Sequence, residues 1–315
     1  MNQKIKNIIK KTPLVHIIKN IKRGIILYKV KKHQSYSFEK IEKCINKKYA
    51  KYNNGKHIDW ENPITYTEKI NVSKLYNSSR IKTELADKIT ARKWVERKIG
   101  DKYLIPLLGV YDNFDDINFE KLPNSFVMKC NHDSGSATIC NNKKELNYNK
   151  LKKDYIFYYK RNLYDLNFEM HYKGIEPKIL IEKNMGSNIN DYKFLCFDGE
   201  PYYCWVDVDR FQGHKRNIYD MNWNLQPFNQ ATYGNSTKTI KQPQKFDEMI
   251  NICKILSKGF DHVRVDLYDI NGYIFFGEMT FTNGNGMEAI MPIEYDYKLG
   301  ELWKNFKSNR NQCIN

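Results

Sequence analysis

The sequence predicts an α+β protein with more than one sheet, because helical and strand patterns occupy different stretches of the chain. Helical spacing of apolar residues dominates the first hundred residues. After Pro177 the pattern changes to short runs typical of strands, with an amphipathic helix among them. The last two runs flank Asn271-Gly272, a dipeptide that strongly favours a hairpin turn. We therefore expect helices, then mixed strands, then a helix and a final hairpin.

The N-terminal segment is predicted to form a helix that starts at Thr12-Pro13, with Thr12 as N-cap. Five apolar residues follow at helical spacing, interspersed with lysines; they are Leu14, Ile18, Ile21, Ile25 and Tyr28. Two interpretations stay open. Residues 1–34 could lie on an anionic membrane surface, or the helix could pack on the body of the protein.

The remaining elements are read from periodicity and turn residues. Helices are expected over 65–76, 80–98, 144–164 and 246–258. Strand signals cover 103–106, 125–130, 137–140, 178–182, 192–197, 202–208, 263–268 and 273–278.

Composition limits the class of protein. The chain has 315 residues, which suffices for one large domain or two to three subdomains. Hydrophobic residues make up 41%, and mean hydropathy is −0.71, as in soluble globular proteins. There is no run of roughly 18 apolar residues. The seven cysteines form no CxxC pair, so we expect a reducing, cytoplasmic setting, at the inner membrane face if the N-terminal helix binds lipid.

The formal charge of +16 is unevenly distributed. Residues 1–38 contain ten of the 52 lysines and arginines and no aspartate or glutamate. The rest of the chain has 42 basic and 36 acidic residues and is only mildly basic. Charge alone therefore does not require a nucleic-acid partner, and none is expected.

One candidate binding segment is the apolar strand that ends in Lys129 and runs into a polar loop containing Ser134, Gly135 and Ser136. Burying a lysine in an apolar strand costs free energy unless an anion accompanies it. A Gly/Ser loop can offer N–H groups and hydroxyls to phosphate oxygens. The alternative is an edge-strand lysine followed by an ordinary polar turn.

A second segment places Glu182 and Lys183 at the end of an apolar strand, with Asp191 and Lys193 shortly after. By itself this pattern also describes a strand that leaves the core.

The third segment is the C-terminal hairpin. Alternation puts Arg264 and Asp266 on one face of its first strand, and Glu278 lies on the second. Two carboxylates that converge there would repel each other without a cation between them, and oxygen ligands with a phosphate partner suit magnesium. The alternative is a solvated hairpin face.

Together, and in this order, these segments resemble the ATP-grasp superfamily, and most closely its TupA-like branch linked to teichuronopeptide and other surface-polysaccharide synthesis. The resemblance covers about residues 62–303. It implies an ATP-grasp fold in which two α+β subdomains, about 85–175 and 176–310, grip the nucleotide. On this basis 1–60 is a basic helical segment and 61–310 is the ATP-grasp domain.

The resemblance also implies roles for individual residues. Lys88 and Lys129 would bind the ATP phosphates, and the loop Ser134, Gly135 and Ser136 would close over them. Glu182 and Lys183 would line the adenine pocket, and Asp191 would bind the ribose. Asp266 and Glu278 would bind Mg²⁺, and Arg264 would stabilise the tetrahedral intermediate.

One departure from the family pattern concerns the metal. Many ATP-grasp ligases have Glu-x-Asn, whereas this chain has Glu278-Met279-Thr280. Thr280 is a poorer magnesium ligand than an amide oxygen, so either the second metal is weak or Asn283 or Asn285 substitutes.

The expected function is ATP-dependent amide formation between a carboxylate and an amine on a cell-surface polysaccharide or its precursor. An acidic substrate, such as an amino acid or a uronic acid, would be held by basic residues, or these residues would form a solvated rim; they are Lys193, Arg210, Lys215 and Arg216. Alternatives are a sugar kinase or another polysaccharide-modifying enzyme on the same fold, and a non-catalytic module that binds glycan through its 23 tyrosines.

Overall fold

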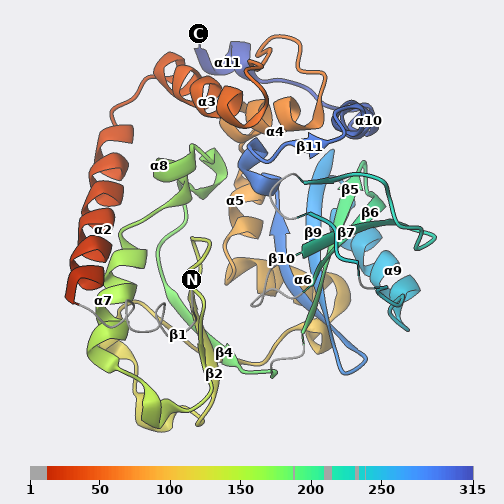
Figure 1. The fold of residues 1–315 in the computed structure, drawn as a ribbon. Helices are drawn as coiled ribbons and strands as arrows, with labels where there is room; N and C mark the ends of the chain where they lie inside the picture. The colour runs from red at the N-terminus through yellow and green to blue at the C-terminus, as the bar shows by residue number, and fades with distance from the viewer. Residues whose placement is uncertain (1–12, 187–188, 209–214, 231–233, 238, 315) are drawn as a thin grey trace.

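The computed structural model describes residues 13–314 except 187–188, 209–214, 231–233 and 238. Its helices are α2 (Pro13–His33), α3 (Phe38–Tyr52), α4 (Tyr66–Tyr76), α5 (Arg80–Ala86), α6 (Thr90–Ile99), α7 (Tyr148–Tyr159), α8 (Leu163–Asn167), α9 (Phe246–Ser257), α10 (Glu294–Leu302) and α11 (Arg310–Ile314). Helices therefore dominate the N-terminal third, and α2 and α3 precede the sheets, as expected (Figure 1).

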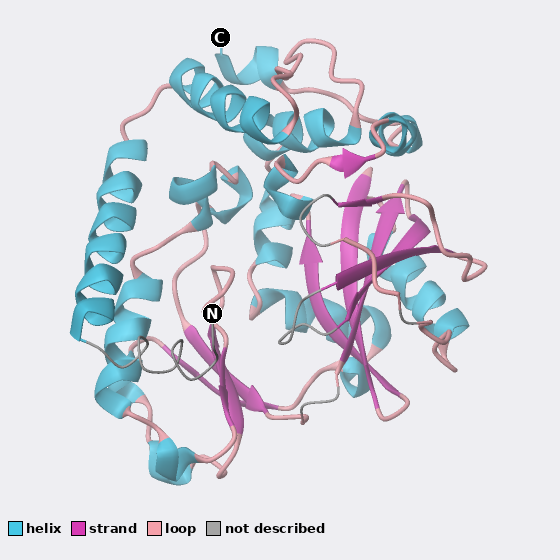
Figure 2. Ribbon diagram, viewed as in Figure 1, coloured by secondary structure: helices cyan, strands magenta, loops and turns pink. Residues whose placement is uncertain are grey.

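Two antiparallel sheets form the body (Figure 2). The small sheet has the order β1 (Leu107–Tyr111), β4 (Ile179–Lys183), β2 (Phe126–Cys130), β3 (Thr138–Cys140). The large sheet has the order β10 (Tyr273–Thr280), β9 (His262–Ile270), β5 (Asn190–Phe197), β6 (Glu200–Val208), β7 (Lys215–Asp220). A two-stranded ribbon pairs β11 (Ile290–Met291) with β8 (Asn229–Gln230). The fold is α+β with more than one sheet, as the sequence predicts.

The large sheet has one apolar face and one mixed face. On the apolar face, alternate residues of β5, β6 and β9 pack against α9, whose Phe246, Met249 and Cys253 are buried in the same core. On the other face the side chains are apolar toward one end and charged toward the other. Because successive side chains of a strand point to opposite faces, this charged row is shielded from the α9 core.

The predicted helix over 80–98 is two helices, which is a correction with consequences for the site. Asp87 has an extended backbone, and its carboxylate accepts from the Ile89 N–H at 2.8 Å and from Asn131 Nδ2 at 3.0 Å. These local and long-range hydrogen bonds replace helical ones. The break places Lys88 beside the end of β2.

The remaining predicted helices and strands can be compared with the observed ones. The strand signal at 103–106 is wrong: residues 101–103 form a 3-10 turn, and β1 begins after Pro106, which has no N–H to give to a sheet. The expected helix over 144–164 is α7 and α8, separated by a short break. The predicted hairpin is confirmed, with Asn271 and Gly272 both at positive φ. Helix 65–76 is also confirmed, with Thr65 and Glu68 forming a capping box.

Candidate functional site

Lys129 lies at the carboxyl end of β2 and forms an ion pair with Glu182 on β4, with Nζ 2.6 Å from Oε2. Arg92 of α6 binds the other oxygen of Glu182 at 2.8 Å. One buried carboxylate is thus shared by two cations, which leaves positive charge at this edge of the small sheet. An anion of the ligand would complete the balance.

The loop after β2 is held in a fixed shape by buried polar groups. Asp133 is 1% exposed and accepts from Ser136 Oγ at 2.5 Å and from Arg161 Nη2 at 2.8 Å. Ser136 Oγ in turn accepts from the Cys130 N–H, while Ser134 is exposed and Gly135 has φ of 85°. The hydroxyl of Ser136 is therefore committed within the loop, whereas Ser134 and the backbone at Gly135 face outward.

Lys88, at the helix break, lies against this loop. Its ammonium donates to the Asp133 carbonyl at 2.6 Å, and its backbone N–H donates to the Asn131 carbonyl. Two lysines from distant parts of the chain, Lys88 and Lys129, thus flank the same strand end.

The hairpin β9–β10 supplies the opposing side. Asp266 and Glu278 are cross-strand partners, and Arg264 donates to both carboxylates. The Arg264 guanidinium binds Asp266 in bidentate fashion at 2.6 and 2.7 Å, and reaches Glu278 Oε1 at 3.1 Å. The expectation that Arg264 and Asp266 share one face is confirmed, and the two carboxylates meet around a cation of the protein itself.

The electrostatics of Glu278 link the two sides of the site. Burial alone would raise the pKa of this carboxyl group, but the positive charges of Lys88, Arg264, Lys193 and Lys129 lower the pKa to about 2. Its side chain is still 41% exposed, because it faces a cavity. Glu278 is therefore an ionised, accessible carboxylate at neutral pH.

Polar side chains that follow Glu278 in the chain already have hydrogen-bond partners within the protein. Thr280 Oγ1 donates to Glu278 Oε1 at 3.2 Å, which orients the carboxylate. Asn283 Oδ1 accepts from Arg264 Nη1 at 2.7 Å, and Asn285 Oδ1 accepts from Lys74 Nζ at 3.0 Å. Both amide oxygens considered as replacements for Thr280 are thus already bound to cationic side chains.

Of the basic residues predicted to hold substrate, two form a buried row across the large sheet. Lys193 lies 2.5 Å from Asp191 and 2.9 Å from Asp266, and these carboxylates outweigh the effect of burial and raise its pKa. Arg216 binds Asp207 at 2.6 Å. The geometry gives Lys193 and Arg216 structural partners within the sheet.

The other two predicted substrate residues lie differently. Lys215 is exposed at the start of β7. Arg210 lies outside the residues that the structure describes. The substrate role of these four residues remains a prediction.

The residues predicted to bind adenine and ribose differ in burial and in their partners. Glu182 is buried beneath Lys129, whereas Lys183 is exposed and its N–H donates to the Pro106 carbonyl at 2.9 Å. Asp191 is 3% exposed and pairs with Lys193. Their roles also remain predictions.

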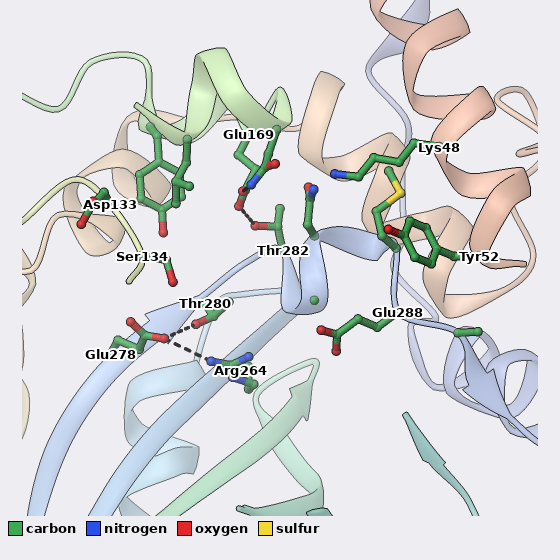
Figure 3. A pocket seen from close by; sticks show the side chains of 17 residues that line it. Lys48, Tyr52, Asp133, Ser134, Glu169, Arg264, Glu278, Thr280, Thr282 and Glu288 are labelled. Atoms are coloured by element: carbon green, nitrogen blue, oxygen red, sulfur yellow. Dashed lines mark hydrogen bonds and ion pairs between the residues drawn. The ribbon is translucent and has the colours of Figure 1, made fainter. Parts of the chain in front are cut away.

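A cavity of about 500 Å³ lies between the loop after β2 and the hairpin (Figure 3). Asp133 and Ser134 face it from one side, and Arg264, Glu278 and Thr280 face it from the other. Its far wall comes from α3 and the segment around α8, where Lys48, Tyr52 and Glu169 point inward; these three were not predicted. The volume suits a small-molecule ligand.

Several residues of the site and its surroundings were missed in the sequence. Glu169 is buried and accepts from Thr282 and Asn167, and burial raises its pKa. Arg92 and Arg161 hold the small-sheet side, as described above. A partial signal existed for Arg92, which lies one helical turn after Lys88, whereas the partners of Arg161 and Glu169 depend on tertiary contacts.

The donor set can be compared with what Mg²⁺ requires. Among the described residues, no group of three or more His, Cys, Asp and Glu side chains could hold a metal ion by itself. Mg²⁺ is commonly held by one or two carboxylates together with substrate phosphates, and Glu278 fits that role. Asp266 is 2% exposed and bound by Arg264 and Lys193, so it would have to exchange a cation of the protein for the metal. The site therefore fits one phosphate-bound Mg²⁺ at Glu278 better than two.

A family model described as TupA-like ATPgrasp matches residues 68–304. No curated protein matches the chain.

Solved structures with similar arrangements include the ATP-grasp ligase PsnB complexed with minimal precursor, at 11% identity and a TM-score of 0.40 over 74% of this chain and 64% of that one. D-alanine–D-alanine ligase from Bacillus anthracis complexed with ATP has 17% identity and a TM-score of 0.42 over 73% and 67%. N5-carboxyaminoimidazole synthetase from Staphylococcus aureus complexed with ADP has 12% identity and a TM-score of 0.38, over 62% of this chain and 43% of that one. The chain spans less than two thirds of the length of the PsnB structure.

Proposed function

Because this chain belongs to the TupA-like ATP-grasp family, we propose that it is an ATP-grasp ligase that uses Mg-ATP to join a carboxylate to an amine on a cell-surface polysaccharide or its precursor. The observation that carries this proposal is the cavity in which Ser134 faces Arg264 and Glu278, with Lys88 and Lys129 close enough to lower the pKa of Glu278.

The proposed reaction has two steps. A carboxylate oxygen of the acid attacks the γ-phosphorus of ATP, and ADP leaves. The amine nitrogen then attacks the acyl carbon, a C–N bond forms, and inorganic phosphate leaves with the oxygen that came from the carboxylate. The phosphate acts as the leaving group that a free carboxylate lacks.

The residues of the chain supply position and charge in this scheme. Lys88 and Lys129 would balance the charge of the transferring phosphoryl group, and the outward-facing backbone at Gly135 would hold phosphate oxygens. Arg264 would stabilise the oxyanion formed when the amine attacks, a role for which its fixed, buried guanidinium is suited. Mg²⁺ bound at Glu278 would neutralise phosphate charge.

Two cations of the cavity could hold the carboxylate of the acid, and four carboxylate side chains line the same cavity. Lys48 and Arg264 offer positive charge from opposite sides, and neither belongs to the four basic residues that the sequence suggested. Tyr52 and Tyr172 add aromatic surface that a sugar ring or an aliphatic amino acid could contact. A panel of acids and amines can identify both substrates.

The test is ADP release by the purified full-length protein with Mg-ATP and a panel of acids and amines. A ligase releases ADP fully only when both an acid and an amine are present. With an ¹⁸O-labelled acid, the label must appear in the released phosphate.

Two outcomes would contradict the proposal. ADP release with a hydroxyl acceptor alone, without an amine, would identify a kinase. Failure of every pair, together with no effect of Mg-ATP on the thermal unfolding temperature, would favour a non-catalytic glycan-binding module.

A further inference from the structure

The N-terminal helix α2 presents two different faces. One face packs on the body: Val30 is 7% exposed, and Arg23 and Lys19 form ion pairs with Asp154 of α7. Arg23 also lies over the ring of Phe157 at 4.8 Å, and His33 Nδ1 is 2.6 Å from the Asp165 carbonyl. These contacts fix the rotation of the helix about its axis, as its position beside α7 and α8 illustrates (Figure 1).

The opposite face is apolar and exposed. Ile18, Ile21, Ile25 and Tyr28 are 43%, 57%, 50% and 66% exposed, and Ile17 beside them is 54% exposed. Spacings of three and four residues place them in one stripe along the helix, about 15 Å long at 1.5 Å per residue. Because the ion pairs hold the other face against α7, this stripe cannot turn inward. Solvated isoleucines in such a row indicate a binding surface.

Charge around the stripe selects its partner. Lys22 and Lys29 border one side, Lys31 lies on the other, and Lys32 continues the stripe at its C-terminal end; all four are exposed. Residues 13–38 contain no aspartate or glutamate. A second copy of the helix would bring lysines against lysines with no acidic partner, which disfavours a coiled coil. A surface that is both apolar and anionic satisfies both features.

We propose that α2 binds the surface of an anionic lipid membrane, lying in the interface with its isoleucine stripe in the acyl region and its lysines among the headgroups. The helix does not cross the membrane: among the described residues, none of the helices has the length and apolar character that a span needs. This proposal is independent of the reaction proposed above, because it uses none of the residues that line the cavity.

The proposal resolves the two interpretations left open by the sequence, since each concerns a different face. The helix packs on the body through one side and leaves the other side available. Ion pairs between α2 and α7 would then transmit the orientation of the bound helix to the whole protein, so that the membrane-bound enzyme has a defined rather than a free orientation.

The test is co-sedimentation of the full-length protein with vesicles of phosphatidylcholine alone and of phosphatidylcholine with one quarter phosphatidylglycerol. We expect pelleting with the second only, and release at 0.5 M NaCl because salt screens the lysines. The double variant I21N/I25N should weaken partitioning about tenfold or more, since it removes two apolar side chains without changing charge. The triple variant K22Q/K29Q/K32Q should weaken it by roughly a hundredfold, at about fivefold per lysine.

The matched control makes the same chemical change elsewhere. Ile64 and Ile255 are 59% and 45% exposed outside α2, and I64N/I255N should pellet like the unmodified protein. Thermal unfolding in the presence and absence of Mg-ATP checks that every variant is folded. Equal pelleting with both vesicle types, pelleting by I21N/I25N at the unmodified level, or a dimer in light scattering that I21N/I25N dissociates without any vesicle binding would each overturn the proposal.

Discussion

Two clusters of charged residues lie next to the cavity, one at the end of β2 and β4 and one on the large sheet. They differ in charge, and the difference could explain how one site holds both a polyphosphate and its cation. The small-sheet side brings together four cations and two carboxylates; they are Lys88, Arg92, Lys129 and Arg161, with Asp133 and Glu182. The large-sheet side brings together three cations and four carboxylates; they are Lys193, Arg216 and Arg264, with Asp191, Asp207, Asp266 and Glu278. Counted over these residues alone, the small-sheet side is net positive and the large-sheet side net negative; of them, Asp133, Arg264 and Glu278 line the cavity.

This contrast in charge suggests that the two sides have different roles in the proposed reaction. The positive side is suited to the phosphates and the negative side to the metal and to the reacting centre. If that division is correct, substitutions on the two sides should affect different steps.

The largest effect is expected on the negative side, from Arg264→Lys. Lysine keeps the charge but cannot bind Asp266 and Asn283 simultaneously with a planar fork. We expect turnover to fall by about 10²–10³, the loss typical of one oxyanion-stabilising donor. Nucleotide affinity should change only severalfold.

The measurement is ADP release with the best acid and amine pair, beside titration calorimetry with Mg-ATP. Because Arg264 is buried, the thermal unfolding temperature must be compared first. Loss of nucleotide affinity together with turnover would break the division between the two sides.

A smaller effect is expected on the positive side, from Lys129→Gln. Removing one charge-assisted contact to phosphate should weaken Mg-ATP binding about tenfold or more. Arg92 remains to neutralise Glu182, so folding should be largely preserved. The matched control is Lys121→Gln, which removes an exposed lysine between β1 and β2 that has no predicted role in nucleotide binding.

Calorimetry with Mg-ATP separates these variants. If Lys129→Gln binds nucleotide as well as Lys121→Gln does, the cations around β2 do not form the phosphate side of the site.

The smallest effect concerns the pH dependence of stability. The pKa of Glu278 is lowered to about 2 from an ordinary 4.5, so its ionised form is favoured by folding. This contribution is complete above pH 4.5 and is lost as pH falls from 4.5 toward 2. Glu278→Gln should therefore destabilise the protein by about 1 kcal/mol at pH 7, a modest value because the side chain is partly solvated.

Urea unfolding of the unmodified protein and of Glu278→Gln at pH 7, 5.5, 4.5 and 3.5 measures the difference in their free energies of unfolding. The difference between the two proteins should be constant from pH 7 to 5.5 and shrink below 4.5. A difference that already changes between pH 7 and 5.5 would mean that the surrounding cations do not hold the carboxylate as described.

The parts of the molecule that sequence could predict are those fixed by neighbours along the chain. Alternation and the Asn271-Gly272 turn determine the hairpin, so the sharing of a face by Arg264 and Asp266 could be inferred. The order of motifs identified the family. The start of α4 is also fixed locally, because Thr65 forms a capping box with Glu68.

The parts that could not be predicted depend on distant partners. Periodicity continued through Asp87, whereas the break in the helix is accompanied by a hydrogen bond from Asn131, 44 residues away, in addition to the local one from the Ile89 N–H. Lys193 looked available for substrate because its partner Asp266 lies 73 residues further on. The wall formed by Lys48 and Tyr52 has no local signal, since α3 reads as an ordinary basic helix.

The origin of that wall has a consequence for how this enzyme could diversify. Helix α3 ends at residue 52, before the stretch that the family model matches, and yet it contributes side chains to the cavity. Under the proposed function, exchanging this leading helix could alter substrate preference while the residues proposed to bind ATP stay unchanged.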